Sequence, residues 1–597
     1  MKLPTADEAV FSIKCYLGAM LALYLAYSIG LPRPFWAMTT AYVVAQPWSG
    51  AVRSKAVYRL GGTFFGSAMT IYTVPRLANY PVLMTLAMVL WVGLCLYIAV
   101  LDRTPRSYLF MLAGYTAAMI GFPSVTDPAL VFDTALARVE EISLGIICAT
   151  LVHSVVLPRG IGRAMMGRLD ATVRDARSWI QDVLNQRGAA QHARDRRTLA
   201  NDITQLRLLS THVPFDTGNI RWTANALRAM QEHITALTPA VSAVEDRLAL
   251  PILGGAPTGR TRRLTRGAAL HRDHGLALLS ALAAALAISV CCLFWIGTAW
   301  TNGATAAMMA AIFSCFFAAQ DNPVPGIMQF LTYTIYSIPL SALYLLGIMP
   351  ALHSFEMLAL AIFPVAFVTG VYIARPTTTG KAMAVFFGLS GTLALQDTHA
   401  ADLVSFVDTI VAQIIGVAVA AIIAAVFRTV SAEWSARRIQ AANWKELAAL
   451  AGAGRAPARL DFTARMLDRI GLLQPRLALS KRRDDQLADD ALQDLRVGKD
   501  IAELQRARRH LPMADPAIQP VLRTLAGLFR KRPGRLGGER PAELLQTIDR
   551  ALYSVSNTPV AHAARERAVV ALVGLRRAFF PEAAAYRPGR DVESPAS

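Results

Sequence analysis

Charged side chains inside long apolar segments are the residues of this chain best placed to do chemistry. Arg138, Glu140 and Glu141 lie at one end of an apolar segment over residues 136–157. Arg138 and Glu141 are three residues apart and share a helix face, whereas Glu140 points elsewhere. A carboxyl group removed from water takes up a proton more easily, and a nearby arginine opposes this. We expect Glu141 or Glu140 to carry a coupling proton, with Arg138 tuning it or binding an anionic substrate. The alternative is an ion pair that ends the helix.

Two further titratable groups are candidates for proton coupling. His153 lies deep in the same apolar segment, where an imidazole either carries a proton or joins two helices by a hydrogen bond. Asp397 lies with His399 near the end of a later apolar segment, and an ordinary solvated loop is the alternative there.

Aromatic pairs near the end of the first apolar segment of each half suggest a site for an aromatic ligand. These are Phe35 with Trp36 and Phe294 with Trp295. Flat aromatic faces combined with a few placed cations suit an aromatic carboxylate. The alternative is a belt of aromatic residues at the membrane surface.

Arg59 and Asp321 complete the predicted substrate site. Arg59 opens the third apolar segment, where it either attracts anions from the cytoplasm or anchors the helix end. Asp321 lies in an Asp-Asn-Pro sequence that either contacts substrate or makes a helix cap and turn. We expect Arg59, Arg138, Asp321 and the two aromatic pairs to bind substrate.

Enzyme and cofactor motifs are missing from the sequence. No Walker A loop, HExxH motif or usable GxSxG motif occurs, and the six cysteines all lie in apolar segments without a CxxC pair. We therefore expect no catalytic residue, no bound metal and no cofactor. An ion gradient, not ATP hydrolysed by this chain, would supply the energy for transport.

Twelve apolar segments of membrane-spanning length must position these residues. The chain is 54% hydrophobic, and only 12 of its 60 Lys and Arg residues lie outside residues 159–272 and 428–590. The expected spans are 11–31, 34–50, 60–75, 81–101, 107–123, 136–157, 275–297, 299–319, 326–347, 355–374, 381–396 and 404–427.

This pattern predicts an all-α polytopic membrane protein of four parts. Residues 1–158 and 274–428 form two membrane halves, and residues 159–273 and 429–597 form basic helical domains with apolar residues at helical spacing. In the last domain this spacing predicts helices over 434–452, 462–473, 485–510, 518–531, 540–556 and 560–579. Short loops expected inside the cell hold seven basic residues, among them Arg53, Lys55 and Arg59 before the third span, and those outside hold three. This difference places the N-terminus and both soluble domains in the cytoplasm. The basic charge therefore indicates lipid contact and not nucleic-acid binding.

The two halves resemble parallel repeats. At a shift of 275 residues, Tyr97–Ala99 aligns with Tyr372–Ala374, and Asp133 aligns with Asp408. Six spans in each half give both the same orientation, as in transporters with duplicated halves.

The sequence also resembles a known family. Residues 31–37 (Leu-Pro-Arg-Pro-Phe-Trp-Ala), residues 59–66 (Arg-Leu-Gly-Gly-Thr-Phe-Phe-Gly) and residues 138–145 (Arg-Val-Glu-Glu-Ile-Ser-Leu-Gly) resemble the membrane half of the fusaric acid resistance family, which includes aromatic acid exporters of Gram-negative bacteria. The resemblance covers both membrane halves and is weak in the soluble domains.

The resemblance implies export of aromatic carboxylic acids or related toxic compounds across the bacterial inner membrane, driven by the proton gradient. It also implies a periplasmic membrane-fusion protein and an outer-membrane channel as partners, and we expect a homo-oligomer. Two alternatives remain, an anion channel and a non-transporting membrane scaffold.

Overall fold

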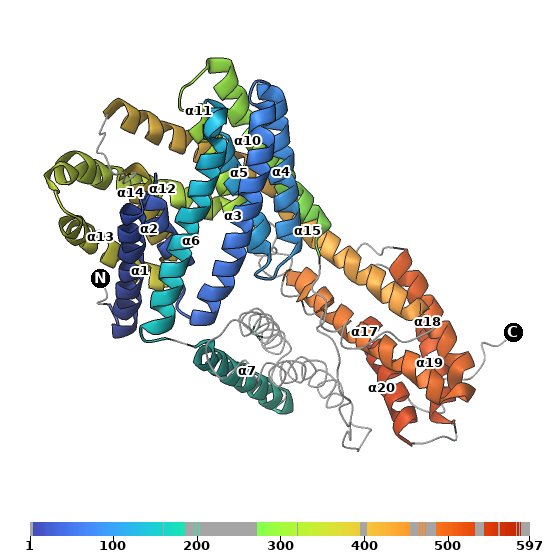
Figure 1. Ribbon diagram of the computed structural model, residues 1–597. Coiled ribbons are helices and arrows are strands. Elements are labelled where there is room, and N and C mark those ends of the chain that lie inside the picture. Colours follow the sequence, from blue (N-terminus) through green and yellow to red (C-terminus); the bar gives the residue numbers. More distant parts are fainter. Residues whose placement is uncertain are drawn as a thin grey trace. The chain divides into compact units, whose positions relative to one another are not determined.

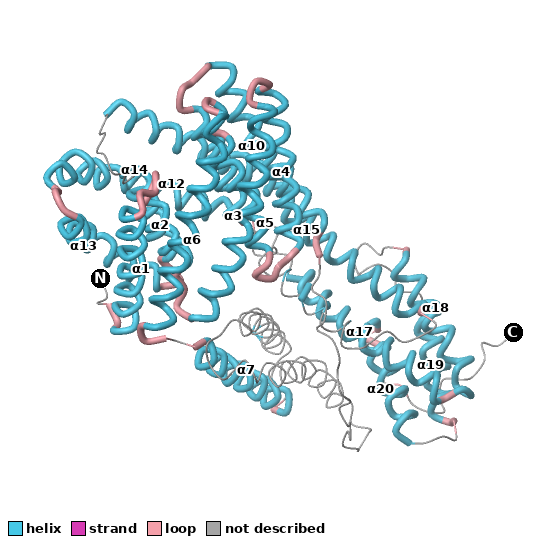
Figure 2. Tube along the Cα trace, viewed as in Figure 1, coloured by secondary structure: helices cyan, strands magenta, loops and turns pink. Residues whose placement is uncertain are grey.

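The computed structural model consists of helices and short connections, and Figure 2 shows no strand in the part of the chain that it describes. The described residues are 4–158, 160–185, 272–318, 322–393, 403–453, 485–531, 542–558 and 562–580, with isolated positions outside these ranges. They fall into two compact units. The first unit holds the described residues up to 164 and from 272 to 431, and the second holds the others.

The first unit contains one helix for each of the twelve predicted apolar segments (Figure 1). Two examples show why the helices begin where they do. A capping box between Thr5 and Glu8 starts the first helix, and the Ser354 side chain caps the tenth. The helices are α1 (Ala6–Ser28), α2 (Phe35–Val44), α3 (Ser49–Leu77), α4 (Pro81–Leu101), α5 (Ser107–Gly121), α6 (Val131–Val155), α10 (His274–Thr298), α11 (Gly303–Phe316), α12 (Pro323–Ala342), α13 (Phe355–Ala374), α14 (Thr379–Leu393) and α15 (Leu403–Gly452). Short 3-10 turns η1 (Pro123–Val125) and η2 (Pro128–Leu130) precede α6, and a π-helix η5 (Leu343–Ile348) and the turn η6 (Met349–Ala351) follow α12.

Seven of the described helical segments are long and apolar enough to cross a membrane. Two shorter apolar helices, α2 and α11, accompany them. The ten residues of α2 extend only about 15 Å, half of a hydrocarbon core. The chain is thus an all-α polytopic membrane protein, as predicted, although twelve full spans stay a prediction.

The boundary between α2 and α3 differs from the prediction. The expected span 34–50 ends at Val44, and α3 begins at Ser49, eleven residues before the expected start of the third span. Arg53, Lys55 and Arg59, which were assigned to a short loop, therefore lie in the first turns of a helix. Their charge lowers the local hydropathy, and this is why the segment was expected to start later.

Helix contacts follow matching patterns in the two halves. α1 packs on α2 and α10 on α11, while α3 packs on α5 and α12 on α14. Across the halves, α1 packs on α13 and α10 on α4. Gly145 of α6 approaches α2 at Ala37, as Gly416 of α15 approaches α11 at Ala306. These contacts support the interpretation of two parallel repeats, which stays a prediction.

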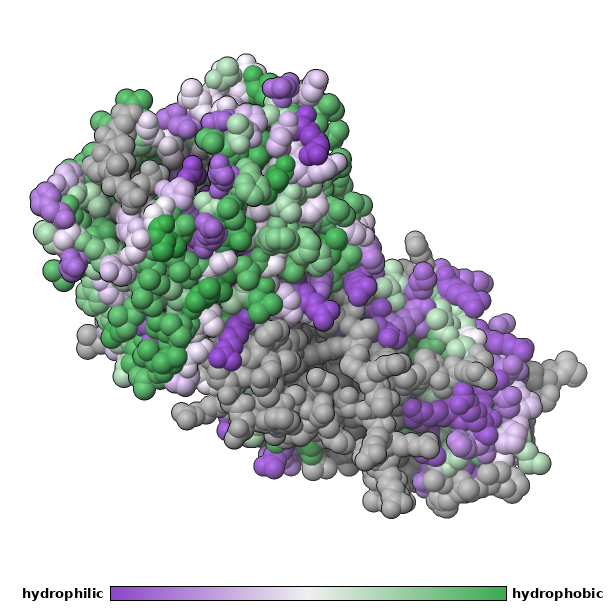
Figure 3. Space-filling view, in the orientation of Figure 1, coloured by the Kyte–Doolittle hydropathy of each residue, from purple (hydrophilic) through white to green (hydrophobic). Residues whose placement is uncertain are grey.

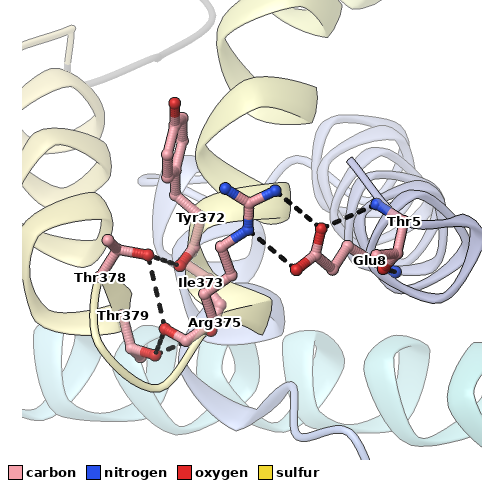
Figure 4. A network of polar contacts seen from close by, with 7 residues as sticks. All are labelled: Thr5, Glu8, Tyr372, Ile373, Arg375, Thr378 and Thr379. Carbon is pink, nitrogen blue, oxygen red and sulfur yellow. Dashed lines mark hydrogen bonds and ion pairs between the residues drawn. The ribbon is translucent and has the colours of Figure 1, made fainter. Parts of the chain in front are cut away.

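An ion pair joins the two halves at one end of α1. The Arg375 guanidinium, just after α13, donates two hydrogen bonds of 2.8 Å to the Glu8 carboxylate (Figure 4). The Tyr97 hydroxyl of α4 and His274 Nδ1 of α10 are hydrogen-bonded at 2.9 Å. Each contact joins the first helix of one half to the end of the fourth helix of the other half.

The second unit is a helical domain with its own apolar core. Its tail helices match the expected segments 485–510, 518–531, 540–556 and 560–579 to within three residues. Only isolated positions of the predicted helix 462–473 are described, and these are helical. Most of the domain 159–273 lies outside the described residues, and the predicted domain boundaries stay a prediction. The helices are α7 (Ile161–Leu184), α17 (Asp485–His510), the turn η7 (Pro512–Ala514), α18 (Asp515–Arg530), α19 (Ala542–Ser556) and α20 (His562–Phe579).

Candidate substrate-binding site

The guanidinium group of Arg59 is enclosed by α2, α3 and α5. It donates to the hydroxyl of Tyr108 at 3.0 Å and to those of Tyr115 and Thr40 at 3.4 Å. The residue is 4% exposed, and within the described part of the chain no carboxylate pairs with it. Because arginine keeps its charge in proteins, Arg59 is a buried cation surrounded by neutral acceptors.

Arg138 of α6 is a second buried cation. Its guanidinium lies 4.2 Å from the centre of the Trp36 ring, a cation–π contact, and 3.6 Å from the carboxylate of Glu141. The Glu141 carboxylate also accepts the backbone N–H of Arg33 at 2.8 Å. Arg138 and Glu141 share one helix face, as their spacing predicts.

One face of α2 aligns these cations with a third. Trp36, Thr40 and Val43 lie on successive turns of that face, and a basic side chain reaches each turn. Arg138 contacts Trp36, Arg59 contacts Thr40, and Lys55 donates from Nζ to the carbonyl oxygen of Val43 at 2.6 Å. We call Lys55, Arg59 and Arg138 the basic ladder. Its steps follow the rise of α2, about 5.4 Å a turn.

Aromatic rings accompany the whole basic ladder. Lys55 Nζ lies 5.4 Å from the centre of the Tyr108 ring, whose hydroxyl accepts from Arg59. Trp36 covers Arg138. Cations held over aromatic faces in this way can bind a carboxylate and stack its ring at the same time.

The basic ladder carries an excess of positive charge. Glu141 is the one carboxylate that pairs with it among the described residues, so three cations face one anion and two positive charges are left over. Such a region attracts an anion, because unbalanced charge inside a membrane is costly.

α3 has its polar face inside and its apolar face outside. Thr63, Ser67 and Thr70 follow Arg59 along one buried face. Large apolar side chains on other faces of α3 are exposed, as is typical of a lipid-facing surface: Val57, Leu60, Phe64, Phe65 and Tyr72. Much of the visible surface over the membrane helices is likewise hydrophobic, as the green regions of Figure 3 show. A polar face that avoids lipid is typical of a helix that lines a pathway.

Buried polar atoms without a hydrogen-bond partner gather at this place. Of the fifteen such atoms among the described residues, seven belong to the side chains around the basic ladder, which singles it out as an incomplete polar site. They are Trp36 Nε1, Arg59 Nε, Thr63 Oγ1, Ser67 Oγ, Thr116 Oγ1, Arg138 Nε and Arg138 Nη1.

The structure thus brings together Trp36, Arg59, Arg138 and Glu141 from the predicted site and separates others from them. Glu140 is exposed and lies on the outward face of α6. His153 is buried twelve residues along α6 from Glu141, about 18 Å away, with its Nε2 3.9 Å from Cys15 Sγ.

The two aromatic pairs occupy different helices and are not equivalent. Phe35 and Trp36 begin α2, whereas Phe294 and Trp295 lie in the last turns of α10. Phe294 is 51% exposed and packs edge-on against Trp300. The two pairs therefore do not occupy symmetric positions. The expected spans that contain them, 34–50 and 275–297, are the second segment of one half and the first segment of the other.

Asp321, Asp397 and His399 lie outside the described residues. Among the described residues, no group of three or more His, Cys, Asp or Glu side chains could hold a metal ion.

Sequence reasoning missed Lys55, Thr40, Tyr108 and Tyr115 as site residues. The spacing of Lys55 and Arg59, one turn apart, is the only local signal that could have found Lys55. The tyrosines belong to α5, about fifty residues later, and only the packing of α3 on α5 brings them to Arg59.

The second half shows a related loop contact, but no Lys or Arg is buried among the described residues of its membrane helices. Asp408 of α15 accepts from Trp300 Nε1 at 2.8 Å and from Asn302 Nδ2 at 2.7 Å, in the loop between α10 and α11. In this role Asp408 resembles Glu141, whereas Asp133, with which the shift of 275 aligns it, is exposed. The α12 sequence contains buried Ser337 but no Lys or Arg.

A cavity of about 40 Å³ lies among α10, α11, α12 and α15. Its lining is mainly apolar, with Ser280 and Ser314 as its polar members, and it includes no residue of the basic ladder. Nothing in this lining would recognise a carboxylate.

Comparison with known proteins identifies relatives of this chain and its family. The p-hydroxybenzoic acid efflux pump subunit AaeB of Musicola paradisiaca is 27% identical over 68% of this chain and 74% of its own length, and that of Edwardsiella ictaluri is 26% identical over 71% and 77%. No solved structure matches the chain. The model of the fusaric acid resistance protein family matches residues 8–256 and 254–586. The chain therefore belongs to the fusaric acid resistance protein family, whose curated relatives are efflux pump subunits.

Proposed function

We propose that this chain exports aromatic carboxylic acids, or related toxic compounds, across the bacterial inner membrane and uses the proton gradient to do so. It acts as a transporter and not as an enzyme. The proposal is supported by the family and by relatives whose names state efflux of p-hydroxybenzoic acid.

One observation carries the proposal: Arg59 is a buried cation with aromatic hydroxyls around it and no carboxylate partner among the described residues. A guanidinium can hold a carboxylate by two parallel hydrogen bonds. The rings of Tyr108, Tyr115 and Trp36 would cover the apolar part of the same ligand.

Glu141 is the proposed coupling residue. Its carboxylate is buried, is held by the Arg33 backbone and faces Arg138 at 3.6 Å. When Glu141 binds a proton, Arg138 loses its anionic partner and becomes free for the substrate's carboxylate. Proton binding and substrate binding therefore influence each other through Arg138. His153, about 18 Å away, is a second proposed proton site.

The proposed orientation has the N-terminus and both helical domains in the cytoplasm. Arg53, Lys55 and Arg59 no longer support it as loop charges, because they lie in α3. The 48 basic residues of segments 159–272 and 428–590 still do. Since the relatives are named pump subunits, we also propose a periplasmic membrane-fusion protein and an outer-membrane channel as partners, and a homo-oligomeric state.

Replacement of Arg59 tests the proposed function. In a strain that lacks its own aromatic acid exporters, the wild-type chain should raise the tolerated concentration of 4-hydroxybenzoate, and Arg59→Gln should remove most of this gain. Loss of a charge-assisted contact costs about 1.5–3 kcal/mol, or roughly 10- to 100-fold in apparent affinity. Arg76→Gln is the matched control, because Arg76 is exposed near the end of the same helix. Equal protein levels must be shown by immunoblot, and full resistance with Arg59→Gln would contradict the proposal.

An anion channel is the second candidate, because two uncompensated cations also suit a pore. An anion that leaves a negative interior gains about 2.3 kcal/mol per 100 mV. Proteoliposomes separate the two functions: a channel carries current when the potential is applied without a pH gradient. A coupled exporter responds to the pH gradient when the potential is held at zero.

A further inference from the structure

Three buried hydroxyl groups beside the basic ladder have no hydrogen-bond partner. They belong to Thr63 and Ser67 of α3 and Thr116 of α5, which are 0%, 3% and 1% exposed. A buried hydroxyl usually donates to a nearby carbonyl, because leaving it unpaired is costly. Unpaired hydroxyls at one place therefore suggest a polar ligand.

Neighbouring threonines on α3 show that the helix could have satisfied these groups itself. Thr70 donates to the carbonyl oxygen of Gly66 at 2.9 Å, and Thr73 donates to that of Met69 at 2.8 Å. Thr63 and Ser67 make no such bond to the preceding turn. Their hydroxyls are free for a partner that is not their own backbone.

The three hydroxyls lie at a defined distance from Arg59, the residue proposed to bind the ligand's carboxylate. Thr63 is four residues after Arg59, about 6 Å along α3, and Ser67 is one turn further. Thr116 lies beside them, because a Cβ added at Gly66 would be 2.8 Å from the Thr116 Cβ.

α2 places Trp36 at the same level. α2 and α3 are consecutive helices joined by only four residues, and two side chains of α3 show that they run in opposite directions. Lys55 contacts Val43 near the end of α2, whereas Arg59, one turn later on α3, contacts Thr40, one turn earlier on α2. Since Arg59 contacts Thr40, a turn forward on α3 corresponds to a turn backward on α2, from Thr40 to Trp36. The unpartnered Trp36 Nε1 thus belongs to the same end of the site as Thr63.

This arrangement matches an aromatic acid with a second polar group. In a para-substituted benzoate the carboxylate and the substituent lie at opposite ends of the ring, about one helical turn apart. With its carboxylate on Arg59, a ring hydroxyl would reach the level of Thr63 and Thr116. The tyrosine rings would contact the apolar part between them.

We propose that Thr63, Ser67 and Thr116 bind a hydroxyl group on the ring of the exported acid and thereby select hydroxylated aromatic carboxylates over unsubstituted ones. This inference rests on the proposed function, since it assumes that the acid's carboxylate binds at Arg59. A site built to pair a substrate hydroxyl disfavours the analogue that lacks it, because its own polar groups are then left unpaired.

The experiment compares benzoate with 4-hydroxybenzoate in proteoliposomes of the full chain. The variants Thr63→Val and Thr116→Val each remove one hydroxyl with little change in shape. Thr70→Val is the matched control, because it removes a buried hydroxyl that already has partners, the carbonyl oxygens of Gly66 on α3 and Ala117 on α5. The measured quantity is the ratio of kcat/KM for the two acids.

The wild-type chain should prefer 4-hydroxybenzoate by about tenfold, the factor expected from one good hydrogen bond. Thr63→Val and Thr116→Val should move this ratio toward one, and Thr70→Val should keep it. The inference is overturned if both Val variants retain the wild-type ratio, or if Thr70→Val changes it equally.

Failure of the proposed function gives a different result. If the wild-type protein transports neither acid, the proposed function is wrong, and calorimetry of the same preparation then decides the inference by binding alone. Tighter binding of 4-hydroxybenzoate that is lost in Thr63→Val supports the hydroxyl site. Equal binding of the two acids, or no binding, overturns it.

Discussion

Trp36 and Thr40 lie one turn apart on α2, and each is contacted by a different buried arginine: Trp36 by Arg138 at 4.2 Å and Thr40 by Arg59 at 3.4 Å. The short helix α2 thereby sets the spacing between cations that come from α3 and α6. Lys55 extends the series by one more turn at Val43. In the proposed transport path, a carboxylate that leaves one of these cations would meet the next about 5.4 Å further on.

Lys55→Gln should weaken transport of aromatic acids without abolishing it. Lys55 is the cation of the basic ladder that lies at the C-terminal end of α2. Its loss removes one proposed binding position for a carboxylate but leaves Arg59 and Arg138 in place. A single contact of about 1 kcal/mol corresponds to roughly a fivefold rise in KM. Initial rates of uptake into inverted vesicles measure it. Lys381→Gln is the matched control, since Lys381 lies 5.6 Å from the Tyr333 ring in the other half, and a similar rise with Lys381→Gln would contradict the role of Lys55.

Glu141→Gln should separate binding of the acid from its export. The amide leaves Arg138 without an anionic partner, so 4-hydroxybenzoate should bind at least as tightly as to the wild type. Because the amide cannot exchange a proton, transport driven by a pH gradient should be lost. Glu140→Gln should behave as wild type, because Glu140 is exposed on the outward face of α6. A Glu141→Gln variant that still responds fully to the pH gradient excludes Glu141 as the coupling residue.

Gly145→Ala should destabilise the membrane unit and impair transport. A Cβ at Gly145 would lie 2.4 Å from the carbonyl oxygen of Ala37, so α6 must move away from α2 and take Arg138 and Glu141 with it. Overpacking of this kind costs about 1–3 kcal/mol. Thermal unfolding in detergent should show a lower midpoint. Gly297→Ala, with open space around the added methyl group, should not lower it, and equal effects of the two changes would argue against close packing at Gly145.

Exchanging the charges of Glu8 and Arg375 should preserve the ion pair between these two positions. Glu8→Arg and Arg375→Glu each place like charges together between α1 and the end of α13, and the double variant restores the pair (Figure 4). Because both side chains are partly exposed and solvent screens their charges, the effect on stability should be small. Unfolding midpoints that are lower in both single variants and recover in part in the double variant would show the contact, because the double variant restores the ion pair but still lacks the Glu8 side chain that caps α1. No recovery would mean that the residues act independently.

The sequence predicted the helices well because a helix that crosses lipid must be a long apolar segment. Each of the twelve apolar segments contains a helix, and the spacing of Arg138 and Glu141 placed them correctly on one face. The start of α3 was wrong because hydropathy treats Lys55 and Arg59 as loop residues, whereas packing against α2 and α5 keeps them inside a helix.

Contacts between distant residues set the limit of prediction from the sequence. Tyr108 and Tyr115 reach Arg59 only because the glycines of α3 let α5 approach closely: a Cβ at Gly62 would lie 2.5 Å from the Leu109 carbonyl oxygen. The aromatic pair Phe294 and Trp295 resembles Phe35 and Trp36 in sequence, but the first lies in α10 and the second begins α2. Local similarity could not distinguish them, because the difference lies in where a loop interrupts the chain.

The most direct test of the binding site is an electron cryo-microscopy map of the full chain with bound 3-iodo-4-hydroxybenzoate, whose iodine identifies the ligand. The account predicts ligand density between α2, α3 and α5, with the carboxylate on Arg59 and the ring hydroxyl toward Thr63. Density in the apolar cavity among α10, α11, α12 and α15, with none beside Arg59, would contradict it.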